Sequence, residues 1–163
     1  MTITELFNIQ YPILQGAMAQ IARYPLAAAV SQAGGLGIIA SGGMSAETLR
    51  HEIRELRKMT DHPFAVNLML MMENIPELVQ VIIDEQVPIV TTGAGTPKHV
   101  MPYLKDAGIK VVPVVASVKH AVKMAELGVD AIIAEGTEAG GHIGNTTTMA
   151  LIPQIVDAVK IPV

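Results

Sequence analysis

The segment 135–142 carries the residues whose types and spacing point most directly to chemistry. It reads EGTEAGGH and follows the apolar run 131–134. An imidazole at the end of a glycine-rich turn can project beyond a strand, and its pKa near neutrality suits proton transfer. A lone histidine in a loop is more often structural than catalytic, so its position alone gives His142 only modest support as a catalytic residue.

The ends of the other apolar runs are rich in small residues and bare backbone. They read QGAM at 15–18, SGG at 41–43, NLM at 67–69, TTGAG at 91–95 and AS at 116–117. Such segments allow a flat or phosphorylated cofactor to approach the main chain closely. For any single loop, the alternative that its glycine only makes a tight turn is equally supported.

Several familiar kinds of site are absent from the sequence. Gly93 and Gly95 begin a G-x-G-x-x-G pattern, but Lys98 stands where the third glycine is required, and no G-x-x-x-x-G-K-[ST] run occurs. The run HEIRE at 51–55 begins like a zinc-protease helix, but Glu55 replaces the second histidine. Because the chain contains no cysteine, disulfides, thiolate catalysis and cysteine-based zinc sites are excluded. We expect no metal site.

Composition limits the class of protein. The chain has 163 residues, of which 50% are hydrophobic and 16% charged, so it can bury the core of one domain. A net charge of −4 gives no reason to expect binding to nucleic acid or to a membrane surface. Residues 24–46 carry no charge, but five glycines interrupt them, so we expect no membrane span. The N-terminus does not read as a signal peptide, and we expect a cytoplasmic protein.

Short apolar runs alternate along the chain with longer amphipathic segments. The runs are rich in Ile and Val with almost no polar alternation, which is typical of parallel strands covered on both faces. The predicted strands are 12–15, 36–40, 64–68, 89–92, 110–115 and 131–134. Apolar stripes with helical spacing follow most of them, such as Leu49, Ile53 and Leu56. The sequence therefore predicts an α/β domain.

The residues alone leave two architectures open. Six strand–helix units are present, and residues 161–163 read as the opening of a seventh strand. A complete eight-unit barrel typically needs about 250 residues, so the length favours an open doubly wound sheet. The stop inside an apparent strand favours a truncated barrel. In either case, ligands bind beyond the carboxyl ends of the strands.

Four segments, taken in order, resemble one family of flavoenzymes. They are YPILQGAM at 11–18, AGGLG at 33–37, VN at 66–67 and EAGGHIG at 138–144. This pattern resembles the flavin-dependent enoyl-acyl-carrier-protein reductase II and nitronate monooxygenase (2-nitropropane dioxygenase) family over essentially the whole chain. TTGAG at 91–95 and AEG at 134–136 are more similar to the reductase branch.

The resemblance implies a TIM (β/α)8-type barrel that carries FMN, here truncated after about six βα units. Residues 1–163 would be a single FMN-binding domain, incomplete at its C-terminal end. His142 matches the catalytic histidine. The positions implied to contact the flavin are Gly16, Ala17, Met18, Asn67, Thr92, Glu135, Gly140 and Gly141.

The resemblance also implies a reaction. FMN would take hydride from NADH or NADPH and pass it to the 2,3 double bond of an enoyl-acyl-carrier-protein thioester, as in fatty acid synthesis. His142 would donate a proton or a hydrogen bond at the α-carbon or the thioester oxygen. In the alternative, a nitronate monooxygenase, the same histidine acts as a base on a small nitronate and O2 reoxidises the flavin.

A third hypothesis is an inactive barrel fragment that self-associates through its strand edges, and a homodimer is compatible with the resemblance too.

The loops after the seventh and eighth strands commonly hold the phosphate in such barrels. We therefore expect the 163 residues alone to bind FMN weakly and to have little activity.

Overall fold

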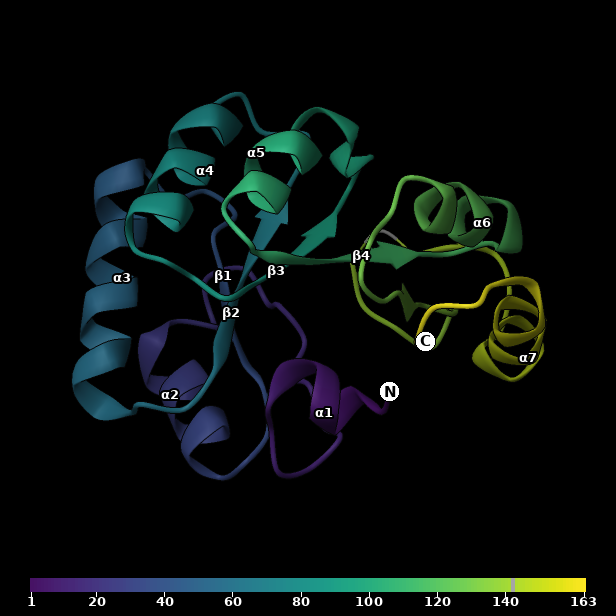
Figure 1. Cartoon of the computed structure of the whole chain (residues 1–163), viewed down its shortest axis with the longest axis horizontal. Helices are drawn as coiled ribbons and strands as arrows, with labels where there is room; N and C mark the ends of the chain where they lie inside the picture. The colour runs from purple at the N-terminus through teal and green to yellow at the C-terminus, as the bar shows by residue number, and fades with distance from the viewer. Residues whose placement is uncertain (142) are drawn as a thin grey trace.

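The computed structural model describes residues 1–141 and 143–163, which fold around a parallel β-sheet (Figure 1). The strands of this part pair in chain order, each parallel to the next. They are β1 (Gly37–Ala40), β2 (Phe64–Met69), β3 (Ile89–Gly93), β4 (Lys110–Val115) and β5 (Ile133–Ala134). The predicted parallel sheet is confirmed.

Helices alternate with these strands, as the sequence predicts. They are α1 (Ile3–Phe7), α2 (Tyr24–Gln32), α3 (Ala46–Met59), α4 (Ile75–Asp84), the 3-10 helix η1 (Pro97–His99), α5 (Met101–Asp106), α6 (Val118–Glu126) and α7 (Thr148–Ala158). All but α1 lie along the outer side of the sheet, whereas α1 lies on its other side (Figure 1).

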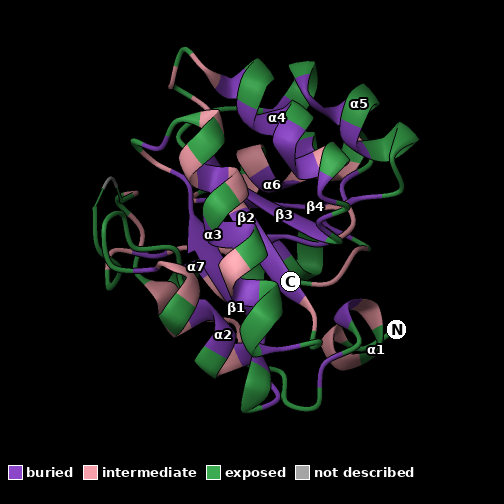
Figure 2. Cartoon of the chain, turned by 90° about the vertical axis from the view of Figure 1, so that its left-hand side faces the viewer, coloured by how far each residue is buried: buried purple, intermediate pink, exposed green. Residues whose placement is uncertain are grey.

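The two faces of the sheet belong to different apolar clusters. The outer cluster joins alternate strand residues such as Val66, Leu68 and Val90 to the helices. The strands in Figure 2 are almost wholly buried, and the outer helices are buried along one side. The inner cluster is smaller and contains Phe7, Ile9, Leu36, Ile38, Ala65, Ile89, Val112 and Ala131. Residues of α1 and the turn after it therefore cover the inner face near the amino ends of the strands.

Helix α3 shows how the sequence directs this packing. The Ser45 hydroxyl accepts a hydrogen bond from the Thr48 N–H and caps the helix. Leu49, Ile53 and Leu56 share one face and are fully buried, as the apolar stripe predicts. Each such side chain contributes about 1.5–3 kcal/mol when it leaves water.

A buried carboxylate joins α3 to α2. Glu52 is only 1% exposed, pairs with Arg23, and accepts a hydrogen bond from the Tyr24 N–H at 2.8 Å. The residue that precedes α2, Arg23, provides no side-chain cap, so Glu52 satisfies the first N–H of that helix. Burial opposes ionisation of Glu52, but the bonds from Arg23 and Tyr24 outweigh it and lower the pKa.

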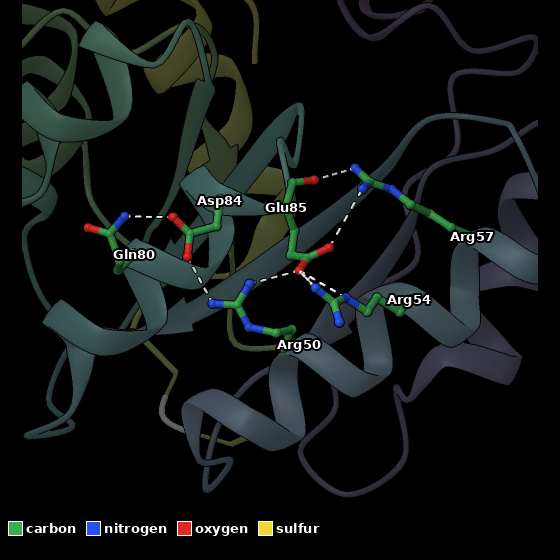
Figure 3. Close-up of polar contacts among 6 residues, drawn as sticks. All are labelled: Arg50, Arg54, Arg57, Gln80, Asp84 and Glu85. Atoms are coloured by element: carbon green, nitrogen blue, oxygen red, sulfur yellow. Dashed lines mark hydrogen bonds and ion pairs between the residues drawn. The ribbon is translucent and has the colours of Figure 1, made fainter.

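A second cluster joins α3 to the end of α4 (Figure 3). The Glu85 carboxylate lies 2.8 Å from both Arg50 and Arg54, and Arg50 also pairs with Asp84 at 2.8 Å. Arg57 donates to the Glu85 carbonyl oxygen. Burial opposes ionisation of Glu85, but the bonds from Arg54 and Arg50 prevail, and its pKa is lowered.

The first predicted strand, 12–15, is reduced to a single bridge. Leu14 pairs with Leu36 in parallel, and the Gln15 N–H donates to the Leu36 carbonyl oxygen at 3.0 Å. Pro12 has no N–H to extend the ladder toward the N-terminus, which explains the difference. At the other edge, the Ile132 N–H donates to Pro162 at 2.9 Å, so residues near 162 lie beside β5.

Glycines end several helices, whereas α4 begins without a side-chain cap. Gly34, Gly108 and Gly128 have φ of +94°, +72° and +85°, the left-handed conformation expected of such caps. Asn74 precedes α4 but makes no side-chain cap. Its side-chain amide instead donates to the Met44 carbonyl oxygen at 2.9 Å, which ties the loop after β1 to α4.

Candidate functional site

The loops that follow the carboxyl ends of the strands lie at one end of the sheet, and we call this end the rim. Because neighbouring strands are parallel, these ends come together. The rim consists of residues 15–18, 41–43, 67–72, 91–95, 116–117 and 135–141. Every described residue predicted to bind the cofactor lies in these segments, although the Thr92 side chain faces away from the others.

Asn67 lies at the centre of the rim, on the middle of three paired strands. It pairs in register with Ala40 on β1 and Thr91 on β3. Its Nδ2 donates to the Thr91 hydroxyl at 3.0 Å, and its carbonyl oxygen accepts from the Ser41 hydroxyl at 2.6 Å. Its Oδ1 receives no hydrogen bond from residues 1–141 or 143–163. Asn67 is therefore held in one orientation with an acceptor free for a ligand.

Thr92 and Thr91, the hydrogen-bond partner of Asn67, lie on opposite faces of β3. Thr92 alternates with Thr91 and shares the side of Val90, which belongs to the outer cluster. Its side chain is 1% exposed, and its hydroxyl has no partner in the described part of the chain. The role of Thr92 as a flavin contact stays a prediction, while the structure brings Thr91 to Asn67. Thr91, which alternates with Ile89 and so shares the inner face of β3, was not among the predicted site residues.

The segment 16–18 is exposed and is held by Gln15. The Gln15 side chain donates to the Ile38 carbonyl oxygen at 3.2 Å and accepts from the Ile38 N–H at 3.1 Å. A Cβ added at Gly16 would meet nothing within 4 Å. Gln15 was not among the predicted site residues. It fixes the backbone that leads into Gly16, Ala17 and Met18.

Glu135 follows β5 and continues its ladder. Its N–H donates to the Val115 carbonyl oxygen at 2.8 Å, and it alternates onto the same face as Ile133 of the inner cluster. Burial raises the pKa of this half-buried carboxyl. A carboxyl that is more readily protonated can donate a hydrogen bond as well as accept one.

The loop after Glu135 carries the remaining predicted residues. Gly140 and Gly141 are exposed, and nothing lies within 4 Å of a Cβ built at either. Glu138 accepts hydrogen bonds from the N–H and the hydroxyl of Thr148, both at 2.8 Å. His142 lies outside the described residues, so its catalytic role stays a prediction.

The described rim residues fit a flat cofactor with polar edges, such as FMN. Open space lies above Gly16, Gly93 and Gly140, so a ring can approach the backbone without meeting a side chain. Asn67 and Glu135 supply side-chain donors and acceptors. Within residues 1–141 and 143–163, no three His, Asp or Glu side chains are grouped as metal ligands.

A cavity of about 440 Å³ lies at the opposite end of the sheet. It is lined by residues that precede or open strands, including His62, Phe64, Ile89 and Lys110. It shares no residue with the rim.

Among the helices that the structure describes, none combines the length and the hydropathy that a membrane span requires.

Known proteins resemble this chain over nearly its full length. The nitronate monooxygenase family model matches residues 1–78 and 71–163. The (3aS,4S,5R,7aS)-5-hydroxy-7a-methyl-1-oxo-octahydro-1H-indene-4-carboxyl-CoA dehydrogenase of Rhodococcus jostii is 38% identical, with 99% of this chain and 46% of the relative covered. A probable nitronate monooxygenase of Staphylococcus saprophyticus is 34% identical, with 99% of this chain and 59% of the relative covered.

A solved structure supports the same conclusion about the fold. FabK from Thermotoga maritima superposes with a TM-score of 0.96 and 51% identity, covering 98% of this chain and 51% of FabK. The chain thus spans about half the length of these proteins. The predicted truncated TIM-type barrel is confirmed as a parallel half-barrel, and the open doubly wound sheet is excluded.

Proposed function

The chain belongs to the nitronate monooxygenase family of oxidoreductases, and on this premise we propose that it forms an FMN-binding domain of an enoyl-thioester reductase. The substrate is the 2,3 double bond of an enoyl-acyl-carrier-protein thioester, and the reductant is NADH or NADPH. The observation that carries this proposal is the 51% identity with FabK, an enoyl-acyl-carrier-protein reductase II, over 98% of the chain. The proposal includes a cytoplasmic location.

The rim residues have defined tasks in this proposal. FMN, when bound, supplies the hydride chemistry that no side chain can provide. Gly16, Gly93 and Gly140 leave room for its ring, and Asn67 offers its free Oδ1. Glu135 offers a carboxyl whose neutral form is favoured by burial. His142 holds a proton for the α-carbon or a hydrogen bond for the thioester oxygen.

The substrate class has separate support from a relative. The Rhodococcus jostii protein is named as a dehydrogenase of a carboxyl-CoA compound, which is a thioester. A site that accepts thioesters in two related proteins favours a thioester here. The acyl chain would lie against the apolar side chains of the rim, of which Met18 is 40% exposed and Met71 is 64% exposed.

Nitronate monooxygenase activity is the second candidate. It is favoured by the matching family model and by the name of the Staphylococcus saprophyticus relative. In this case, His142 acts as a base toward a small nitronate instead of as a donor toward a thioester.

We further propose that these 163 residues by themselves hold FMN weakly. The rim offers groups for the ring, whereas the phosphate in such barrels commonly lies against the loops after strands seven and eight. A phosphate left in water forgoes charge-assisted hydrogen bonds worth about 1.5–3 kcal/mol each. Titration of FMN into the chain should therefore give a weak, saturable complex, and tight stoichiometric binding would contradict this part of the proposal.

Anaerobic mixing in excess FMN distinguishes the two activities. Bleaching of the flavin by NADH or NADPH faster than in a protein-free control, followed by reoxidation by a crotonyl thioester, supports the reductase. Bleaching only by an alkyl nitronate supports the monooxygenase. Replacement of His142 with Ala should preserve FMN binding and slow turnover, and unchanged turnover would remove this residue from the reaction. Absence of any flavin complex would refute both activities for this chain.

A further inference from the structure

In the loop between β5 and α7, the carboxylate of Glu138, near the start of the loop, binds Thr148 at the start of the helix. One oxygen of Glu138 accepts hydrogen bonds from the N–H and the hydroxyl of Thr148, each at 2.8 Å, and from the Thr137 hydroxyl at 3.2 Å. Glu138 and Thr148 are ten residues apart in the chain. Together they form what we call the clamp.

The clamp supplies a cap that α7 otherwise lacks. Thr147 precedes the helix but makes no side-chain cap, and the first N–H groups of any helix need outside partners. Glu138 satisfies the N–H of Thr148, the first helical residue, and its negative charge is favourable beside a helix N-terminus. The backbone bond from Thr148, followed by that from its hydroxyl, lowers the pKa of Glu138. The clamp is therefore ionised at neutral pH.

The loop is held close to the rest of the chain at both ends and at Gly144, where a built Cβ would lie 2.6 Å from the Ala116 Cβ, but not at Gly140 and Gly141. The Thr137 N–H donates to the Thr146 carbonyl oxygen at 3.0 Å. A Cβ at Gly136 would lie 2.4 Å from the Thr148 nitrogen, so the backbones touch there. Gly140 and Gly141, in contrast, have nothing within 4 Å of a built Cβ. Two consecutive glycines without neighbours have wide conformational freedom unless the flanking chain is held.

We infer that Glu138 is a positioning residue, which caps α7 and thereby fixes the segment from Ala139 to Gly141 and the point where the chain enters His142. The effect on turnover rests on the proposed function, whereas the effect on the loop does not. Glu138 itself contacts α7 and Thr137 and has no role at the reacting atoms. Its loss should free the loop and leave the sheet intact.

Amide hydrogen exchange of the full 163-residue chain tests the clamp directly. Glu138→Ala removes the acceptor, Glu138→Gln keeps one oxygen that can accept from Thr148, and Thr148→Val removes only the hydroxyl. Glu126→Ala is the matched control, because Glu126 is exposed at the end of α6 and its side chain makes no hydrogen bond to any described residue. Exchange within 137–148 should rise about fivefold to tenfold in Glu138→Ala and less in the other two clamp variants. Equal exchange in Glu138→Ala and Glu126→Ala would overturn the inference.

Turnover at saturating FMN tests whether the clamp acts through His142. Glu138→Ala should lower kcat about tenfold to a hundredfold with little change in the KM for NADH or NADPH, and Glu138→Gln should restore most of it. In a His142→Ala background, Glu138→Ala should cost nothing further. An equal loss in both backgrounds would refute action through His142. If the wild-type chain shows no thioester reduction, the proposed reductase fails, and hydrogen exchange still decides whether the clamp holds the loop.

Discussion

Two helices of this chain, α2 and α7, are capped by glutamates from elsewhere in the sequence, yet the two caps lie in very different surroundings. Glu52 satisfies the N–H of Tyr24, is 1% exposed and pairs with Arg23. Glu138 satisfies the N–H of Thr148, is exposed, and its other donors are neutral hydroxyls. The same kind of hydrogen bond thus occurs twice. One lies among the packed helices and strands outside the rim, which we call the frame, and the other lies in the candidate site.

The difference in burial between the two glutamates indicates which property each cap supports, the stability of the fold or the order of the loop. A buried carboxylate that pairs with a cation leaves an unpaired charge and a cavity when it is removed. An exposed carboxylate leaves groups that water can reach, so the fold tolerates its loss. Removal of Glu52 should therefore affect stability, and removal of Glu138 should affect the loop.

The largest expected effect is that of Glu52→Ala. Arg23 would lose its partner, and the first N–H of α2 would lose its acceptor. Because Arg23 is partly exposed, the expected loss is about 2–4 kcal/mol, somewhat below the range for fully buried pairs. Urea unfolding followed by circular dichroism measures it, with Glu126→Ala as a control expected to stay within about 0.5 kcal/mol. If Glu52→Ala lost no more unfolding free energy than Glu126→Ala, Glu52 would not stabilise the fold and the contrast with Glu138 would be refuted.

Glu85→Ala extends the comparison to a second carboxylate of the frame. Glu85 holds Arg50 and Arg54 together at the end of α4 (Figure 3). These arginines are more exposed than Glu85, so the expected loss is about 1–3 kcal/mol. The same unfolding assay applies. A change in the exchange of residues 137–148 without a loss of stability would show that this cluster does not belong to the frame.

Acid should weaken the frame through Glu52 by a smaller amount. The folded-state pKa of Glu52 is lowered, so its contribution is complete above the ordinary carboxyl pKa and is lost as the pH falls through the lowered value. Glu52→Gln cannot titrate and should show a flatter decline of the urea midpoint below about pH 5. Parallel declines in the two proteins would indicate that other carboxylates account for the acid sensitivity.

The smallest expected effect on stability is that of Glu138→Ala. The exposed clamp should shift the melting temperature by less than about 2 °C relative to Glu126→Ala. Thermal unfolding followed by circular dichroism provides the measurement. A shift as large as that of Glu52→Ala would place the clamp in the frame and remove the contrast between the two caps.

Much of this fold could be predicted from the sequence, because its signals are local. The buried stripe of α3 and the left-handed caps at Gly34, Gly108 and Gly128 follow from spacing within a few residues. The barrel itself could not be derived in this way, since the length of the chain favoured an open doubly wound sheet. The resemblance at 11–18, 33–37, 66–67 and 138–144 decided for the barrel.

The site could be predicted less completely, because its contacts are between distant residues. Neither cap shows in a local pattern, since Glu52 is 28 residues from Tyr24 and Glu138 is ten from Thr148. The choice between Thr91 and Thr92 depends on which face of β3 looks inward. That parity is set by the inner cluster as a whole, and a single strand does not reveal it.

The position of α1 has a consequence for the order in which the chain can fold. The strands are neighbours in chain order, so each can pair with the one made just before it, and such short-range contacts form early. Phe7, however, belongs to the same cluster as Ala131. That part of the interior has to wait until more than a hundred further residues have been synthesised. We expect the first helix of the chain to reach its final packing only late in synthesis, although Leu36 and Ile38 of the same cluster are available to Phe7 much earlier.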